Sequence, residues 1–147
     1  MQDQSIKTVA TDCTCLNLRK ASRVVTQLFD QALQPSGILA SQFTLLAALS
    51  LAESVSITRL AQELVMDRTT LTRNLKPLER QGLIRIEPGQ DQRVRVVSLT
   101  EKGQAALVKA LPFWKQAQTK VIEELGQSRW QALLSNLSDT VSLLRES

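Results

Sequence analysis

The 147-residue sequence has no histidine and no tyrosine, and aromatic residues make up only 3% of it. Without histidine, the chain cannot form a Ser-His-Asp or Cys-His catalytic site or a histidine-ligated zinc site, and it lacks the commonest general base near neutral pH. A glycine-rich loop of the kind that cradles phosphates is also missing. These absences argue against an enzyme, and we expect no cofactor.

Long apolar runs are missing too, since no stretch approaches the roughly 20 residues that a membrane-spanning helix needs. The first residues, MQDQSIKTVATDC, contain neither the basic segment nor the apolar segment of a secretory signal. With 43% hydrophobic and 22% charged residues, the composition is that of a globular protein. We therefore expect one domain of ordinary size, located in the cytoplasm.

The charge is unevenly placed along the chain. The net charge is +4, and the segment from Arg59 to Arg95 has eight basic and five acidic residues, a net charge of +3. A basic segment favours an anionic partner without identifying it.

The spacing of the apolar residues predicts a mainly helical protein. The predicted helices cover residues 12–34, 41–52, 57–64, 68–81, 101–125 and 129–145. Asp12, Ser56 and Asp67 each stand where a side chain can cap the helix that follows. Pro35 to Gly37 end the first helix, and Gly82 ends the fourth.

The centre of the chain predicts a winged helix-turn-helix. Two short helices, 57–64 and 68–81, are separated by three residues, which is the outline of a helix-turn-helix. Residues 83–87 and 94–99 have β-strand patterns and flank the turn residues 88–92, so they predict a β-hairpin. The fold class is therefore mainly α with a small hairpin, here called the wing.

In a helix-turn-helix the second helix enters the major groove of DNA. Leu71, Leu75 and Leu78 have the spacing of a core-facing stripe. The opposite side, here called the recognition face, is made of Arg68, Thr69, Thr70, Thr72, Arg73 and Lys76. Arginine and threonine suit contacts to bases and phosphates. The alternative interpretation is a solvated helix face that is basic by chance.

The wing carries a second candidate contact. Arg93 lies at the predicted tip, where the negative potential of a minor groove would attract it. Asp91 can hold the Arg93 guanidinium by a charge-assisted pair and order the tip before DNA arrives. Arg95, on the next strand, is assigned to the same surface. Alternatively, these are ordinary turn and surface residues.

The segment from Ser56 to Gly103 resembles the winged helix-turn-helix of the multiple antibiotic resistance regulator (MarR) family. The resemblance is carried by Asp91-x-Arg93 with Leu99-Thr100-x-x-Gly103, and is supported by Leu60-Ala61-x-x-Leu64 and Leu78-Glu79-x-x-Gly82-Leu83-Ile84. It implies a bacterial transcription regulator, usually a repressor, that binds a pseudo-palindromic operator as a homodimer. It also implies that helix 68–81 is the recognition helix and that Arg93 enters the minor groove.

A dimer needs a surface that joins two copies. The last predicted helix has an apolar stripe, here called the terminal stripe, made of Trp130, Leu133, Leu137, Val141 and Leu144. Either it packs on the first helix of its own chain or it binds a second copy. We expect a winged lobe over 38–100 and dimerisation helices over 12–34 and 101–145.

Two features bear on regulation. Leu111-Pro112-Phe113-Trp114 lies where the resembling family often has an effector cleft, so Trp114 lines a pocket or is simply a core residue. Cys13 and Cys15 are inert small side chains, a thiol sensor of oxidants, or soft-metal ligands. On a regular helix their side chains point about 200° apart, so a disulfide between them requires the helix end to unwind.

The sequence therefore predicts a homodimeric repressor that a small molecule or thiol oxidation releases from its operator. The alternative is a winged-helix module that uses its basic face to bind an acidic protein without sequence-specific DNA binding.

Overall fold

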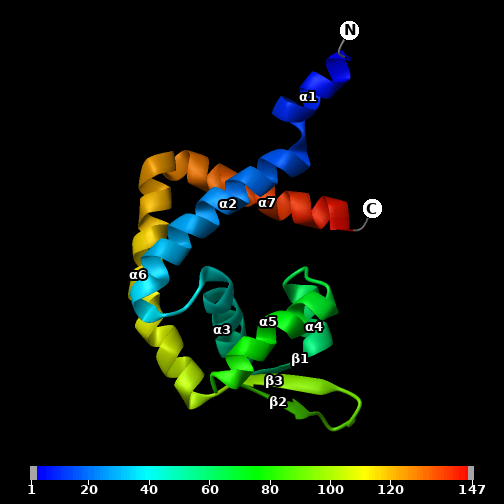
Figure 1. Ribbon diagram of the computed structural model, residues 1–147, viewed down its shortest axis with the longest axis vertical. Helices are drawn as coiled ribbons and strands as arrows, with labels where there is room; N and C mark the ends of the chain where they lie inside the picture. The colour runs from blue at the N-terminus through cyan, green and yellow to red at the C-terminus, as the bar shows by residue number, and fades with distance from the viewer. Residues whose placement is uncertain (1–2, 146–147) are drawn as a thin grey trace.

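The computed structural model describes residues 3–145 and consists mostly of helices with one small sheet (Figure 1). The helices are α1 (Gln4–Asp12), α2 (Thr14–Leu33), α3 (Ala40–Ala52), α4 (Ile57–Glu63), α5 (Arg68–Arg80), α6 (Glu101–Leu125) and α7 (Gln127–Arg145). A 3-10 turn, η1 (Gln34–Ser36), follows α2, and the strands are β1 (Ser54–Ser56), β2 (Ile84–Pro88) and β3 (Arg95–Leu99). This order confirms the predicted fold class.

Figure 1 shows two regions joined by the long helix α6. The winged lobe contains α3, α4, α5 and the sheet, while α1, α2 and α7 lie at the other end of the molecule. Helix α6 leaves the sheet, packs against α3 and then against α2, and ends where α7 turns back. Pro112 lies inside α6 and Pro77 inside α5, and neither interrupts its helix.

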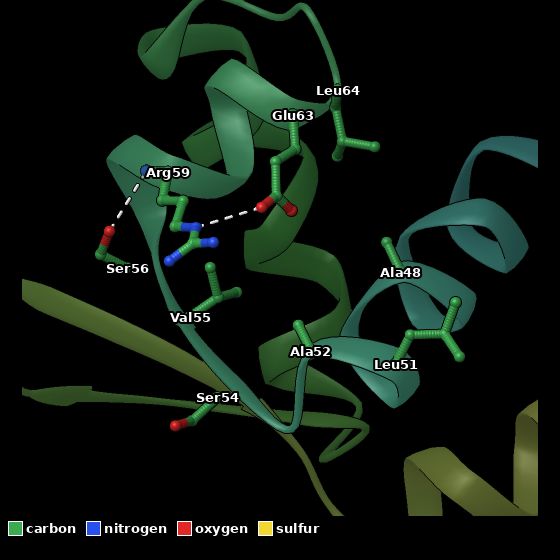
Figure 2. A pocket seen from close by; sticks show the side chains of 9 residues that line it. All are labelled: Ala48, Leu51, Ala52, Ser54, Val55, Ser56, Arg59, Glu63 and Leu64. Carbon is green, nitrogen blue, oxygen red and sulfur yellow. Dashed lines mark hydrogen bonds and ion pairs between the residues drawn. The ribbon is translucent and has the colours of Figure 1, made fainter.

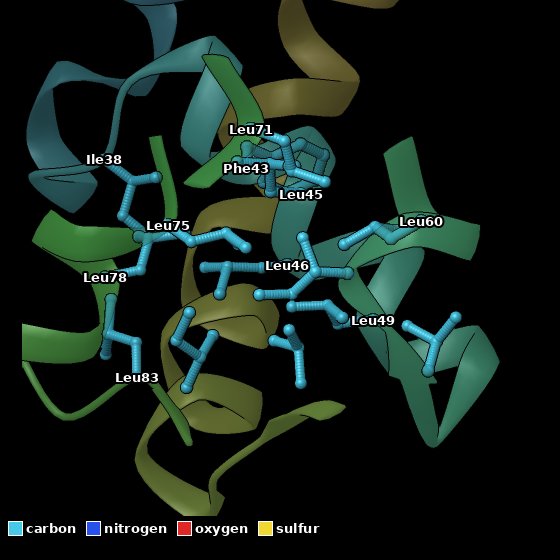
Figure 3. Close-up of a cluster of buried hydrophobic side chains, with 14 of the residues drawn as sticks. Ile38, Phe43, Leu45, Leu46, Leu49, Leu60, Leu71, Leu75, Leu78 and Leu83 are labelled. Atoms are coloured by element: carbon cyan, nitrogen blue, oxygen red, sulfur yellow. The ribbon is translucent and has the colours of Figure 1, made fainter. Parts of the chain in front are cut away.

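The hydrophobic core lies in the winged lobe and at its junction with α2 and α6 (Figure 3). Its fully buried large side chains are Leu33, Leu46, Leu49, Leu60, Leu71, Leu75, Leu78 and Val97. Leu71, Leu75 and Leu78 form the buried face of α5, as their spacing predicted. Among residues 3–145, no polar or charged side chain is buried. The core is therefore held by close packing of leucines rather than by polar networks.

The helix-turn-helix is set by two caps and a left-handed turn. Ser56 Oγ accepts a hydrogen bond from Arg59 N at 3.2 Å, and Asp67 Oδ1 accepts one from Thr70 N at 2.9 Å, which confirms both predicted caps. Between the helices, Val65 has φ 56°. Its amide donates to Gln62 O, and the Met66 amide donates to Ala61 O. A β-branched residue is strained in this conformation. The exposed Val65 is flanked by Leu64 and Met66, which pack against the core and hold the turn.

The sheet has three strands rather than the two of the predicted hairpin. Its order is β1-β3-β2, and both pairs are antiparallel. Strand β1 was not predicted, because it has only three residues between the end of α3 and the start of α4. Val55 of β1 pairs with the fully buried Val97 of β3, so the extra strand anchors the wing to the lobe.

The motif Leu99-Thr100-x-x-Gly103 has a structural cause. Thr100 Oγ1 accepts from Gly103 N at 3.0 Å and donates to Gly82 O at 2.6 Å, so one hydroxyl caps α6 and ties it to the end of α5. A Cβ on Gly103 would collide with the Leu83 carbonyl and with a methyl group of Leu99. Only glycine lets α6 start this close to the sheet.

The start of the first long helix differs from the prediction. Asp12 is the last residue of α1, a helix that the sequence analysis did not assign, and Cys13 is the N-cap of α2. Cys13 Sγ accepts from Leu16 N at 3.4 Å. Asn17 Nδ2 donates to Thr11 O and Cys13 O, both at 2.9 Å, so its amide bridges the break between the helices.

At the other end, α7 begins at Gln127 rather than Arg129, because Gly126 alone makes the break, with φ 84°. No single helix within residues 3–145 combines the length and apolar character of a membrane span. The pair 4–36 and 40–52 reaches both only when taken together, and it is bent by 75°.

Candidate nucleic-acid interface

The recognition face is accessible to a ligand along the front of α5. Arg68, Thr69, Arg73 and Lys76 are exposed, and Thr70 and Thr72 are half-buried. Every predicted residue of this face therefore lies outside the core, while Leu71, Leu75 and Leu78 lie inside it. In the described part of the chain, Asp67 and Glu79 are the acidic residues nearest in sequence to this face, and Asp67 is engaged in capping the helix.

Asp67 and Thr70 form a double contact at the start of α5. Asp67 Oδ1 accepts from Thr70 N at 2.9 Å, and Asp67 Oδ2 lies 2.6 Å from Thr70 Oγ1. These hydrogen bonds from Thr70, with a smaller effect of the Arg73 charge, lower the pKa of Asp67 below its usual value of 3.8. The carboxyl group is therefore ionised at neutral pH.

Arg93 extends from the tip of the wing. Its side chain is 91% exposed, and its Nε lies 3.4 Å from Asp91 Oδ1, which also accepts from Arg93 N at 3.0 Å. Asp91 thus contacts Arg93 as predicted, although an exposed ion pair contributes little free energy on its own. Arg95, at the start of β3, is exposed as well.

Trp114 satisfies both interpretations drawn from the sequence. Its ring stacks on Phe43, with centroids 5.9 Å apart and an interplanar angle of 17°, so it packs against the core. It also lines a cavity of about 350 Å³ between α3 and α6, a size that suits a small organic molecule. Ser50 Oγ donates to Gln104 Oε1 at 3.0 Å at this cavity, and the other lining side chains are apolar.

A second cavity, of about 710 Å³, lies between the end of α3, β1 and α4 (Figure 2). Arg59 Nε and Glu63 Oε1 form an ion pair 3.1 Å long on its wall, and Leu51, which is 89% exposed, lies at its edge. This cavity was not predicted from the sequence. The signal that could have found it is an apolar residue, Leu51, near the end of an otherwise core-facing helix.

Cys13 and Cys15 are free thiols, with Cys13 half-buried and Cys15 exposed. The expected 200° separation does not apply, because Cys13 has an extended backbone outside the helix and only Cys15 lies within α2. Cys13 Sγ faces the Leu16 amide at the start of the helix. Across residues 3–145, no three potential ligands among His, Cys, Asp and Glu are grouped for a metal.

The terminal stripe is not covered by its own chain. Leu133, Leu137, Val141 and Leu144 are 38–65% exposed, Trp130 is half-buried, and no residue of 127–145 is buried. Helix α7 packs mainly against α6 rather than against α2. The interpretation that the stripe packs on the first helix of the same chain is therefore wrong for this protomer.

A helix-turn-helix followed by a wing, with an exposed basic recognition helix, defines the class of winged-helix proteins. The MarR family model matches residues 36–93. The transcriptional regulator MosR of M. tuberculosis, in a structure with DNA, is 39% identical, with 91% of this chain and 99% of MosR covered and a TM-score of 0.80.

Two curated relatives are also named as a transcriptional regulator or a repressor. The organic hydroperoxide resistance transcriptional regulator of Bacillus subtilis is 34% identical over 98 residues, which is 66% of this chain and 67% of the relative. The homoprotocatechuate degradative operon repressor of Escherichia coli is 27% identical, with 92% of this chain and 87% of the repressor covered. The chain belongs to the MarR family and is a transcriptional regulator, which confirms the resemblance seen in the sequence.

Proposed function

We propose that this regulator acts as a cytoplasmic repressor and binds a pseudo-palindromic operator as a homodimer. The recognition face of α5 enters the major groove, and Arg93 of the wing enters the neighbouring minor groove. In a symmetric dimer, two recognition helices about one DNA turn apart would each contact one half-site. The winged lobe, residues 38–100, makes the DNA contacts, and residues 12–34 and 101–145 hold the dimer together.

The observation that carries this proposal is the exposure of two separate cationic elements. Arg68, Arg73 and Lys76 lie on the solvent side of α5, and the Arg93 side chain is almost fully exposed at the end of the wing. Neither element is used to stabilise the core. Guanidinium groups placed in this way suit guanine edges in a major groove and the negative potential of a narrow minor groove.

The dimer is supported by the exposed terminal stripe. Four adjacent large apolar side chains of α7 face solvent in the protomer, and soluble proteins generally cover such patches. A two-fold axis would bring the stripe onto the same helices of a second copy.

The release signal has two candidate sites. The mostly apolar cavity at Trp114 lies between α3 of the winged lobe and α6, so a small organic molecule bound there would bias how the lobe sits on the dimer helices. The thiols of Cys13 and Cys15 lie at the junction of α1 and α2, where oxidation would change the cap of α2. The B. subtilis relative, named for organic hydroperoxide resistance, favours the thiol signal.

The test begins with selection of bound sequences from random duplex DNA by the purified protein, once reduced and once oxidised. A palindromic consensus is expected from the reduced protein. Arg93→Ala should then weaken binding to that site at least about tenfold and lower the slope of log affinity against log salt by about one.

The matched control is Lys7→Ala, which removes the same charge from an exposed position on α1, outside the winged lobe and the proposed dimerisation helices. If Arg93→Ala behaves like Lys7→Ala, the wing does not contact DNA. If the protein selects no DNA sequence at low salt but captures acidic proteins, the alternative of a protein-interaction module is correct.

A further inference from the structure

Thr70 differs from the other hydroxyl residues of the recognition face because its hydrogen is already engaged. We propose that Asp67 fixes the hydroxyl of Thr70 as a pure hydrogen-bond acceptor toward DNA. Thr70 then selects, in each half-site, a base that offers an amino hydrogen, adenine N6 or cytosine N4. This inference rests on the proposed function, because it concerns the same recognition helix.

The direction of the bond follows from the atoms involved. A threonine hydroxyl has one hydrogen and two lone pairs, and in general it can turn to donate or to accept. Thr70 Oγ1 lies 2.6 Å from Asp67 Oδ2. An ionised carboxylate has no hydrogen to give, so Thr70 must be the donor. Its only hydrogen therefore points at Asp67, and both lone pairs are left for other partners.

The Asp67 carboxylate that accepts the Thr70 hydroxyl hydrogen is itself held in a fixed orientation. Asp67 Oδ1 accepts from the Thr70 amide at 2.9 Å, so the two carboxylate oxygens bind the backbone and the side chain of the same residue. These bonds keep the pKa of Asp67 low, and the group stays ionised throughout the neutral range. The acceptor state of the Thr70 hydroxyl is thus a fixed property of the folded helix end.

The consequence for DNA follows from the hydrogen-bond pattern of the grooves. In the major groove, amino hydrogens are offered by adenine N6 and cytosine N4, whereas guanine O6 and N7 and thymine O4 accept. Phosphate oxygens also only accept. A hydroxyl without a free hydrogen is therefore unsuited to phosphate, guanine or thymine oxygen. Thr70 lies in the first turn of α5, the part of a recognition helix that reaches base edges.

Asp67→Asn reverses the polarity while keeping the cap. Asparagine caps helices as well as aspartate does. Its Oδ1 can still accept from the Thr70 amide, while its amide nitrogen donates to Thr70 Oγ1 and forces the hydroxyl hydrogen outward. The variant should therefore change which base is preferred without removing the residue that reads it.

The experiment selects binding sites from random duplex DNA with five full-length proteins: wild type, Asp67→Asn, Thr70→Val, Thr70→Ser and the double variant Asp67→Asn/Thr70→Val. Thermal unfolding of each protein checks that it is folded. We expect Asp67→Asn to move the preference at one position of each half-site from adenine or cytosine to guanine or thymine. The shift should be about two- to tenfold, which is the effect of one hydrogen bond. Thr70→Val should flatten the preference at that same position.

The double variant provides the decisive comparison. If Asp67 acts through the Thr70 hydroxyl, adding Asp67→Asn to Thr70→Val causes no further change in base preference. Thr70→Ser keeps the hydroxyl and should keep the wild-type preference. The inference is overturned if Asp67→Asn leaves the preference unchanged, or if it shifts the preference equally in the Thr70→Val background.

Failure of this inference can be told apart from failure of the proposed function. A wild-type protein that selects a palindrome, together with an Asp67→Asn variant of unchanged preference, overturns only the role of Thr70. A wild-type protein that selects no sequence overturns the operator-binding function, and the role of Thr70 is overturned with it.

Discussion

The winged lobe and the terminal helices bury their apolar side chains to very different extents. In the lobe, each of α3, α4 and α5 turns at least three residues into one shared core. In the terminal region, residues 4–12 and 127–145 bury none, and α2 buries only Leu33 at its end. The lobe is complete within one chain, whereas the terminal helices are not.

This difference separates two kinds of stability. Burial of side chains such as those of α5 stabilises the lobe whether or not a second copy is present. The terminal stripe can contribute comparable free energy only when another surface covers it. If a second copy covers it, that contribution depends on the protein concentration, because it comes from dimerisation. The lobe and the dimer should therefore respond to different substitutions, and three experiments test that separation.

The largest expected effect is on the lobe. Leu75→Ala removes a fully buried side chain from the core face of α5 and leaves a cavity, so it should lower the free energy of unfolding by about 2–5 kcal/mol. Leu51→Ala is the control in the same lobe, because Leu51 is 89% exposed and its loss should change the free energy by less than about 0.5 kcal/mol. Urea unfolding measures both. If the two substitutions lowered the free energy of unfolding equally, Leu75 would not be a core residue of the lobe.

The second experiment breaks the dimer and leaves the lobe intact. Leu137→Arg places a charge in the terminal stripe, where Leu137 is 38% exposed. The variant should become monomeric and lose operator affinity about 100-fold or more, because the two half-sites are no longer bound together. Analytical ultracentrifugation and operator titration measure this.

Ser135→Arg is the matched control for Leu137→Arg, since Ser135 lies on the same helix but outside the stripe. It should remain a dimer with nearly unchanged affinity. A dimeric Leu137→Arg protein would show that the stripe is not the interface.

The same contrast explains what the sequence could predict. Features set by neighbouring residues were predicted correctly, such as the caps at Ser56 and Asp67 and the buried spacing of Leu71, Leu75 and Leu78 on α5. Exposure of the recognition face followed from the same periodicity, and exposure of Arg93 followed from its place at the tip of the predicted hairpin. The DNA roles of these residues remain predictions.

Features set by distant residues were missed. Strand β1 has three residues and exists because Val55 pairs with Val97, more than 40 positions away. The N-cap residue of α3, Leu39, has no side-chain oxygen. Asp30 Oδ1 on α2, ten positions earlier in the chain, accepts from the Ala40 amide at 2.7 Å. Asp12 predicts a helix start because aspartate is a strong cap, whereas the Asn17 amide stabilises a break at Cys13. Local preference cannot reveal such partners.

The smallest expected effect concerns a contact between the two regions. Arg145 Nη2, at the end of α7, donates to the Gln62 carbonyl of α4 at 2.6 Å. The same carbonyl accepts from the Val65 amide in the left-handed turn, so a cation from the terminal region stabilises the negative end of α4. The contact is exposed, and Arg145→Ala should lower the free energy of unfolding by less than about 1 kcal/mol.

Arg145→Lys keeps the charge and tests whether geometry matters, because lysine cannot reproduce the planar guanidinium. Hydrogen exchange at the Val65 amide is the sensitive measurement, since local opening of the turn exposes it without global unfolding. Faster exchange in Arg145→Ala, with unchanged exchange in the centre of α5, would show that the terminal helix steadies the turn. Unchanged exchange at Val65 would show that the Arg145 contact contributes nothing to holding the turn closed.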